Sequence, residues 1–509
     1  MFVPQLKKGL LASILSVAQS FIEKSVGLIS TLVLARVLVP EDFGLVAMAT
    51  IFFGFVSILG QTGGQHYLLR ANDINDDMLN TSWTINLALK ALIAAVTVVS
   101  APHVADYFGD VRLTQILYFY AFTTVVSGLE NPGLNLLRRE QHLLPIVINN
   151  LCGKVLAVAS AISIALIFES YWALVIGQFI SILTKVTGSY FVHSHRPRFC
   201  LTNMREQFGF SIWLIAQASL GYGRTQLDTF LVASGFSQNQ LGQYNVMKYI
   251  AFLPNILVLG PATEPLLRQL SSIKDSAEHF RTSLNVSTFT ALLIAIPVAV
   301  FCYTKSEPLV ELLLGNQWVE YAYLFSLFSL LIPAFVAFHQ ANRLMIIYGH
   351  TKYIFIYEIF AFTGIYSTLY LAGLDNLVLF TGIRVSLENV FSFSLLIVTV
   401  SAYTGPRNLF RMLLLFIPLI LSALFSLEFM ALLPDMPDSP VIIELILHGG
   451  AYALAYGLFS ITYVLMLKKH IGEFSTLYNY AQKIAGALGN KASNKRFSDN
   501  RIQAGKQQG

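Results

Sequence analysis

Apolar residues in this chain fall in long runs that are separated by short polar or charged turns. A run of about 20 apolar residues forms a helix long enough to cross the hydrocarbon layer of a bilayer. The alternating pattern of a membrane β-barrel strand is absent from the sequence. We therefore predict an all-α, polytopic membrane protein with about 14 transmembrane helices. We expect these helices near residues 9–35, 43–62, 82–104, 113–130, 143–168, 170–192, 207–234, 241–267, 284–304, 321–342, 352–372, 377–403, 412–432 and 441–467.

The segment from Ser25 to Arg70 recurs later in the chain at a constant offset of 198 residues. Without any gap, Gly44 then aligns with Gly242, and Arg70 aligns with Arg268. Such a match indicates a duplicated unit. Because an even number of predicted helices separates the two copies, both point the same way, and we predict two parallel, pseudo-symmetric six-helix lobes. The expected parts are an N-lobe (1–193), a linker (194–206), a C-lobe (207–404), two further helices (405–467) and a basic tail (468–509).

The positive residues alternate from one side of the predicted membrane to the other. Twenty-three Lys and Arg lie in the tail and in loops on one side, whereas the opposite loops hold only Arg36, Arg112 and Lys305. Basic loops stay in the cytoplasm, so both termini are predicted to be cytoplasmic. The composition agrees with a membrane protein, since only 12% of the residues are charged, about half the share in soluble chains.

Seven cations fall inside the predicted helices, where each would cost roughly 2.5 to 3.5 kcal/mol if it faced lipid. Polar residues repeat at helical spacing beside them, as Asn86 does beside Lys90. We therefore expect them to line a hydrated, positively charged substrate cavity. An alternative is snorkelling or private ion pairing, because Asp228 and Glu388 lie four residues from two of these cations. The seven candidates are Lys24, Lys90, Lys154, Lys185, Arg224, Lys248 and Arg384.

Two of these lysines are predicted to lie at the same depth. Lys154 and Lys185 flank a short hairpin, from Phe168 to Tyr171, at equal distances along the chain. At 1.5 Å per residue, both lie about 21 Å from that end of the hairpin. Two ammonium groups at one depth would repel each other in a dry site, so a shared anion or water is expected between them.

Carboxylates within the predicted helices are candidates for ion coupling, because burial can favour proton exchange while a neighbouring cation opposes it. The candidates are Glu23, Asp228, Glu358 and Glu388. Coupling to H⁺ or Na⁺ is left open, and no cofactor and no bound metal are expected. The three scattered cysteines suggest neither a disulfide nor a metal site.

Helix breakers occur at matching places in the two copies of the repeat and indicate a binding or gating region. They are Gly60, Gly63 and Gly64 in the first copy, and Pro254, Pro261 and Pro265 in the second. At the boundary between N-lobe and linker, His193 and His195 are expected to be solvated rather than to act as ligands. Within the tail, the stretch FSTLYNYAQKIAGAL is a candidate amphipathic helix on lipid headgroups.

Enzyme signatures are missing from the sequence. It has no phosphate-binding P-loop, no GxSxG elbow and no HExxH motif. A membrane polymerase or ligase would need a large outer loop, which is also absent from the predicted topology. We therefore expect a transporter rather than an enzyme, and no nucleic-acid partner.

The stretch LARVLVPEDFGLVAMA resembles the polysaccharide transporter family, the Wzx-like flippases of the superfamily that includes MATE exporters and lipid II flippases. The residues that carry the resemblance are Arg36, Leu38, Pro40, Phe43 and Gly44. The likeness extends over about residues 5–404, and the 14-helix count is similar to that of the longer members. Lipid II flippases resemble one another in several arginines of the first two helices, whereas the first helix here has only Lys24 in its interior.

The resemblance implies a MATE-like fold in the bacterial inner membrane. It also implies that the protein flips undecaprenyl-diphosphate-linked oligosaccharide by alternating access. The expected partners are this substrate, membrane lipids, and the polymerase and export machinery. An alternative is a MATE-like, cation-coupled exporter of small organic molecules, although such a substrate favours a more acidic cavity than these cations provide.

Overall fold

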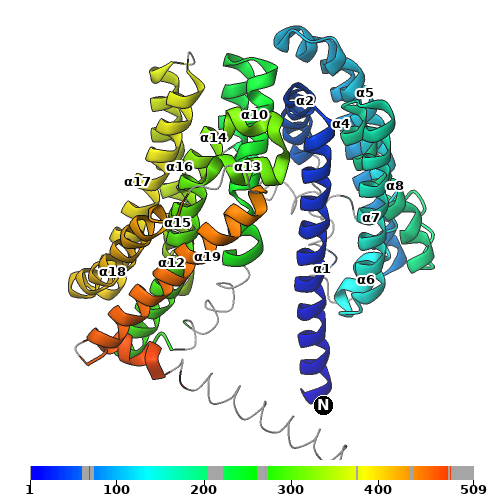
Figure 1. Cartoon of the computed structure of the whole chain (residues 1–509). Helices are drawn as coiled ribbons and strands as arrows, with labels where there is room; N and C mark the ends of the chain where they lie inside the picture. Colours follow the sequence, from blue (N-terminus) through cyan, green and yellow to red (C-terminus); the bar gives the residue numbers. More distant parts are fainter. Residues whose placement is uncertain are drawn as a thin grey trace, which may run out of the picture. The chain divides into compact units, whose positions relative to one another are not determined.

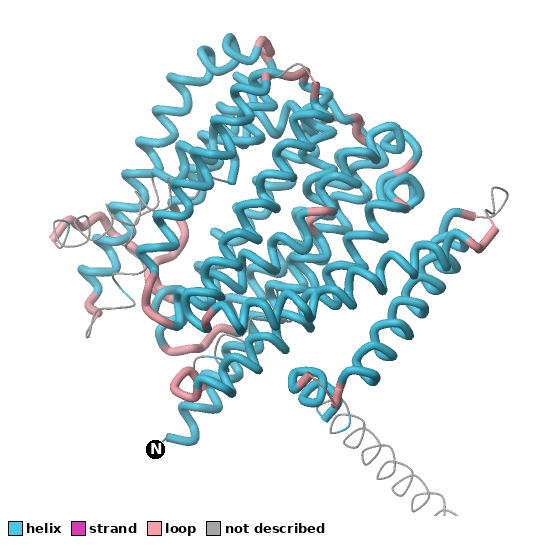
Figure 2. Tube along the Cα trace, turned by 90° about the vertical axis from the view of Figure 1, so that its left-hand side faces the viewer, coloured by secondary structure: helices cyan, strands magenta, loops and turns pink. Residues whose placement is uncertain are grey.

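The computed structural model describes residues 2–59, 68, 74–202, 204, 222–223, 225–260, 270, 273–373, 376–434, 440–469, 471–479 and 482, with the side chains of the first helix from residue 17 onward. Regular structure in these ranges is helical throughout (Figures 1 and 2). Eleven helices of the described part are long and apolar enough to cross a membrane. The predicted all-α, polytopic fold is confirmed. The count of fourteen stays a prediction, because the helices expected at 207–234 and 241–267 extend outside the described residues.

The first part of the chain forms long helices close to the predicted ranges. They are α1 (Phe2–Val37), α2 (Pro40–Leu59), α4 (Asp76–Phe108), α5 (Arg112–Gly128), the short α6 (Leu134–Arg139), α7 (Leu144–Phe168) and α8 (Trp172–Val192). Local chemistry sets their ends. The Asn75 side chain accepts a hydrogen bond from the Met78 amide at 2.8 Å and so caps the start of α4. Gly109 ends α4 in the left-handed region, at φ 72°.

The later part contains α10 (Gln238–Ala251), α12 (Ala277–Thr304), α13 (Ser306–Leu314), a 3₁₀ turn η2 (Asn316–Tyr321), α14 (Ala322–Ser329), α15 (Leu331–Ile347), α16 (Thr351–Ala372), α17 (Leu377–Thr404), α18 (Pro406–Ala431) and α19 (Val441–Leu467). After α10, Pro254 precedes a π-helical turn, η1 (Asn255–Leu259), and such turns are frequent at functional sites. The other helix breakers predicted to mark a gating region lie outside the described residues.

Contacts divide the chain into two compact units. The first contains residues 1–253, 306–328 and 360–384, and the second contains 254–305, 329–359 and 385–509. In the first unit, α1 and α8 pack on α7, α4 packs on α5, and α2 packs on α10. In the second, α12 contacts α15 and α18, and α18 contacts α19. The predicted boundaries of the lobes remain a prediction.

The start of the tail packs within the second unit. The Phe474 side chain is 1% exposed, and its ring lies 5.4 Å from that of Phe289. Glu473 accepts a hydrogen bond from the Asn285 amide at 2.9 Å. Phe474 and Leu477 of the predicted amphipathic segment therefore pack on protein and not on lipid headgroups. Residues 480–481 and 483–488 of that segment lie outside the described residues.

Candidate functional site

A cavity of about 510 Å³ lies among α2, α4, α5, α6 and α8, and we call it the N-terminal cavity. It combines charged groups, amides, hydroxyls and aromatic rings. The side chains that matter below are Phe53, Ser57, Trp83, Asn86, Lys90, Tyr120, Ser127, Glu130, Arg138 and Gln178. Of the seven predicted cations, the structure places Lys90 here. It also brings Asn86, predicted to share a helix face with Lys90, and Gln178 of α8 to the same cavity.

The packing of α4 against α5 holds Lys90 in this cavity. A Cβ atom on Gly128 would lie 3.0 Å from Leu87 and 3.3 Å from the Lys90 side chain, so the glycine permits the close approach. Lys90 Nζ donates a hydrogen bond to Ser127 Oγ at 2.9 Å. Ser127 in turn donates to the carbonyl oxygen of Thr124 at 2.7 Å. The ammonium group is therefore anchored on one side and remains part of the cavity lining.

A second group of predicted residues gathers where α1, α7 and α8 meet. Lys154 Nζ lies 3.2 Å from the position that a Cβ on Gly27 would take. The Lys185 side chain passes over Gly153, and a Cβ atom on Gly153 would lie 3.0 Å from Lys185 Cγ. Glu23 and Lys185 both interact electrostatically with the Lys154 ammonium group. The structure thus brings Glu23, Lys154 and Lys185 together, while the neighbouring Lys24 is exposed.

The third group surrounds Asp228, which is 1% exposed. Its carboxylate accepts hydrogen bonds from Lys248 Nζ at 2.7 Å, the Tyr244 hydroxyl at 3.0 Å and the Thr229 amide at 2.7 Å. Arg384 Nε lies 3.7 Å from the same carboxylate. Lys248, which has no carboxylate within one turn of its own helix, thus pairs with one from residues 225–235. The predicted partner Arg224 lies outside the described residues.

The remaining coupling candidates belong to the second unit. Glu358 is half-buried, and Glu388 is 9% exposed. Assignment of Glu23, Asp228, Glu358 and Glu388 to ion coupling remains a prediction.

Two glycines permit the close packing of α2 on α10. A Cβ atom on Gly44 would fall on the carbonyl oxygen of Gln238, and one on Gly242 would fall on that of Pro40. Positions 238 and 242 are the equivalents of positions 40 and 44 in the repeat, since each pair differs by 198 residues. Both helices also begin at equivalent residues. The sequence repeat is therefore visible as a symmetric contact, which we call the glycine crossing.

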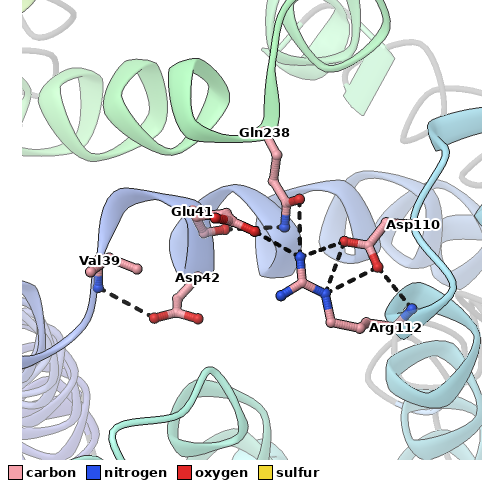
Figure 3. A network of polar contacts seen from close by, with 6 residues as sticks. All are labelled: Val39, Glu41, Asp42, Asp110, Arg112 and Gln238. Carbon is pink, nitrogen blue, oxygen red and sulfur yellow. Dashed lines mark hydrogen bonds and ion pairs between the residues drawn. The ribbon is translucent and has the colours of Figure 1, made fainter.

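A network of polar contacts joins the same two helix starts (Figure 3). Arg112 contacts Glu41 at 2.8 Å, Asp110 at 2.7 Å and the Gln238 side chain at 3.3 Å. Burial alone would raise the pKa of Asp110, but the hydrogen bonds and charge of Arg112 outweigh it and lower that pKa. The Arg112 guanidinium group thus links α2, through the Glu41 carboxylate, to α10, through the Gln238 side-chain amide.

The residues that carry the family resemblance surround this crossing. Arg36 donates to the carbonyl oxygen of Leu312, and Leu38 is 1% exposed. The rings of Phe43 and Trp318 meet edge to face at 5.7 Å. None of the five residues lines the N-terminal cavity. Within the described part of the chain, the motif therefore acts in packing.

The linker contains polar contacts that sequence reasoning missed. Asn131 donates to the carbonyl oxygens of His193 and His195 at 3.0 and 2.8 Å. A His195 ring nitrogen lies 3.1 Å from Asn80 Oδ1, and its side chain is 12% exposed. The expectation that His195 is solvated was wrong, because its ring contacts Asn80 in the first turns of α4 and its carbonyl oxygen accepts from Asn131 between α5 and α6. Asparagines close to turns, such as Asn80 and Asn131, were the sequence feature that could have indicated these contacts.

The fold and the cavity define a helical, multi-pass membrane protein with a charged, polar site inside its first helices. This chain belongs to the family described as polysaccharide biosynthesis proteins, whose model matches residues 33–323. It is 23% identical over 288 residues to the succinoglycan biosynthesis transport protein ExoT of Rhizobium meliloti, covering 56% of this chain and 58% of that protein. It is 20% identical over 302 residues to the lipopolysaccharide biosynthesis protein WzxC of Escherichia coli, covering 57% and 60%. The chain thus spans less than two thirds of the length of these relatives.

Solved structures show the same fold. The lipid II flippase MurJ, in an inward closed conformation, matches with a TM-score of 0.72 at 14% identity, over 90% of this chain and 99% of MurJ. An inward-facing MATE multidrug transporter matches with a TM-score of 0.57 at 14% identity, over 79% and 98%. The predicted membership of the polysaccharide transporter family is confirmed by the family match, and the predicted MATE-like fold is confirmed by these structures.

Proposed function

We propose that this protein is a flippase for undecaprenyl-diphosphate-linked oligosaccharide repeat units, which feed synthesis of an exopolysaccharide, lipopolysaccharide or teichuronic-type polymer. The observation that carries the proposal is the N-terminal cavity, where Lys90 and Arg138 lie among amides inside an apolar helical protein. Charges in such a place are costly unless they serve a path or a ligand. The family and the transport proteins among the relatives support the same reading.

The lysine pair on α7 and α8 suits the diphosphate of this substrate. A diphosphate that leaves water loses hydration, and ammonium groups replace part of that stabilisation through charge-assisted hydrogen bonds. Lys154 and Lys185 lie on adjacent helices, and the Glu23 carboxylate offsets part of their positive charge. The other predicted cations remain candidates for the rest of the path, with Lys248 and Arg384 held beside Asp228.

The proposed location is the bacterial inner membrane with both termini in the cytoplasm. After replacement of the native cysteines, a Cys at the exposed Ser237 is expected to react with an impermeant thiol reagent from outside. A Cys at the exposed Lys274 is expected not to react. The reverse pattern would invert the protein and the direction of transport.

A deletion strain tests the function itself. We expect the lipid-linked repeat unit to accumulate in the cytoplasmic leaflet and polymer export to stop, with both restored by the wild-type gene. Normal export without a paralogue would contradict the proposal. If drug susceptibility rises instead, the protein is a MATE-like exporter.

The lysine pair is tested in the same strain. Lys154→Gln and Lys185→Gln are each expected to lower flipping strongly at wild-type abundance, with partial recovery by Arg. The double Gln variant should be little worse than either single variant if both lysines bind one ligand. Full activity of both abundant Gln variants would show that the lysines are structural.

We also propose that an ion gradient drives the cycle through one or more of the predicted carboxylates. Vesicles with an imposed pH or Na⁺ gradient distinguish the two ions. Equal flipping with and without both gradients would contradict coupling.

A further inference from the structure

The lining of the N-terminal cavity offers both hydrogen-bond donors and acceptors. Lys90 and Arg138 only donate, an ionised Glu130 only accepts, and Asn86 and Gln178 do both. A diphosphate presents only acceptors when ionised, and the Glu130 carboxylate would repel it. A sugar hydroxyl donates and accepts at once. The mixed lining therefore favours a hydroxyl-rich ligand over a diphosphate.

Two buried polar atoms of this cavity lack a hydrogen-bond partner among the residues that the structure describes. They are Trp83 Nε1 and Ser57 Oγ, and Trp83 is only 8% exposed. Buried polar groups are normally paired, by protein, water or ligand. An indole N–H is a donor only, whereas the serine hydroxyl both donates and accepts. Both atoms are suited to hydroxyl groups of a ligand.

Aromatic rings supply the apolar part of the same lining. The rings of Phe53 and Tyr120 lie 4.8 Å apart and both border the cavity. A pyranose ring has faces of C–H groups and a rim of hydroxyls, so it needs apolar surfaces beside polar groups. Binding sites for small molecules have this composition, with aromatic walls and a few convergent polar groups.

We propose that the N-terminal cavity binds the sugar portion of the transported lipid-linked oligosaccharide, through Trp83, Ser57, Lys90 and Glu130. This inference rests on the proposed function and adds to it a separate site for the sugars. In this arrangement the lysine pair on α7 and α8 takes the diphosphate. Selectivity among repeat units then depends on the cavity rather than on the lysine pair.

The test measures binding to the purified full-length protein in nanodiscs. The probe is the free oligosaccharide released by mild acid from the host strain's own lipid-linked intermediates, and calorimetry gives the Kd. Trp83→Phe keeps the aromatic surface and removes one neutral donor, so we expect Kd to rise about fivefold. Lys90→Gln removes a charged donor and is expected to raise it roughly 10- to 100-fold.

Trp172→Phe is the matched control, because Trp172 on α8 packs on Phe119 and is not part of the cavity lining. It is expected to leave Kd unchanged. Ser57→Ala provides a second cavity variant should Trp83→Phe fold poorly. The proposal is overturned if the wild-type protein shows no saturable binding, or if the folded cavity variants bind like the wild type.

Inorganic pyrophosphate serves as a competing probe. It is expected not to displace the oligosaccharide, and displacement that Lys90→Gln abolishes would identify an anion site and overturn the proposal. A negative result in these binding experiments would leave the deletion phenotype intact. Failure of the flippase function itself would appear in the deletion strain.

Discussion

The glycine crossing and the N-terminal cavity lie in the same compact unit, yet their polar groups are arranged in opposite ways. Around the crossing and along α10, charged groups have protein partners, as Asp228 and Arg112 do. In the cavity, Trp83 Nε1 and Ser57 Oγ have none in the described part of the chain. The polar groups around the crossing hold helices together, whereas these two polar atoms of the cavity are available to hydrogen-bond a ligand.

This difference explains why the family resemblance indicates the fold but not the residues that contact substrate. The motif from Arg36 to Gly44 lies at the packed region, so it reports the fold of the family. The groups proposed to contact substrate lie elsewhere and have no such motif.

The largest effect is expected from Asp228→Asn. The change leaves Lys248 and Arg384 beside a neutral amide in a buried place. Removal of one member of a buried ion pair costs about 3 to 5 kcal/mol in the free energy of unfolding. Thermal unfolding of the purified protein measures it, with the exposed Asp106→Asn on α4 as control. A loss no greater than that of the control would show that this network does not stabilise α10.

Gly242→Leu tests the crossing directly. Its side chain would strike the backbone oxygen of Pro40, which cannot move without shifting α2. Overpacking of this kind costs about 1 to 3 kcal/mol, sometimes more. The control is Gly450→Ala on α19, where a new Cβ meets nothing within 4 Å. Equal unfolding midpoints for both variants would contradict the close crossing.

A smaller effect is expected from Arg112→Gln. The arginine side chain is 43% exposed, and such ion pairs contribute about 0 to 1 kcal/mol, less at high salt. Arg112 lowers the pKa of Asp110, so its contribution is complete above the unfolded pKa of about 3.9. It is lost as the pH falls through the lower folded-state value. Unfolding midpoints of wild type and variant should therefore differ constantly from pH 8 to 5 and converge in acid. A difference that grows in acid would contradict this assignment.

The sequence predicted the helices and the repeat because both depend on local pattern. Long apolar runs place α7 and α8 to within a residue or two, and the offset of 198 makes Gly44 and Gly242 equivalent positions. That these two positions also meet in space is shown only by the structure. The charged cavity was predicted only in part. Lys90 and Asn86 share a helix face and were found, whereas Trp83 and Ser57 have ordinary residue types for apolar helices. Their importance depends on which neighbours they lack, and that is a property of the tertiary structure.

The smallest effect is expected from Ser57→Ala, and the comparison between packed and binding regions depends on it. The Ser57 hydroxyl is buried and has no partner among the described residues, so its removal sacrifices no hydrogen bond. The matched control is Ser189→Ala on α8, also within a helix. Ser189 Oγ accepts from the backbone N–H of Asn131 at 3.0 Å and donates to the Val186 carbonyl oxygen at 2.6 Å.

Removal of the Ser189 hydroxyl leaves the buried backbone N–H of Asn131 without this acceptor and should cost about 1 to 3 kcal/mol in the free energy of unfolding. Both variants gain the same helix propensity of alanine over serine, so the difference between them isolates the hydrogen bonds. We expect Ser57→Ala to unfold within about 0.5 kcal/mol of the wild type and Ser189→Ala well below it in thermal unfolding. If the two variants are equally destabilised, the Ser57 hydroxyl already forms a hydrogen bond within the protein. The cavity then has one hydrogen-bond donor fewer for a sugar.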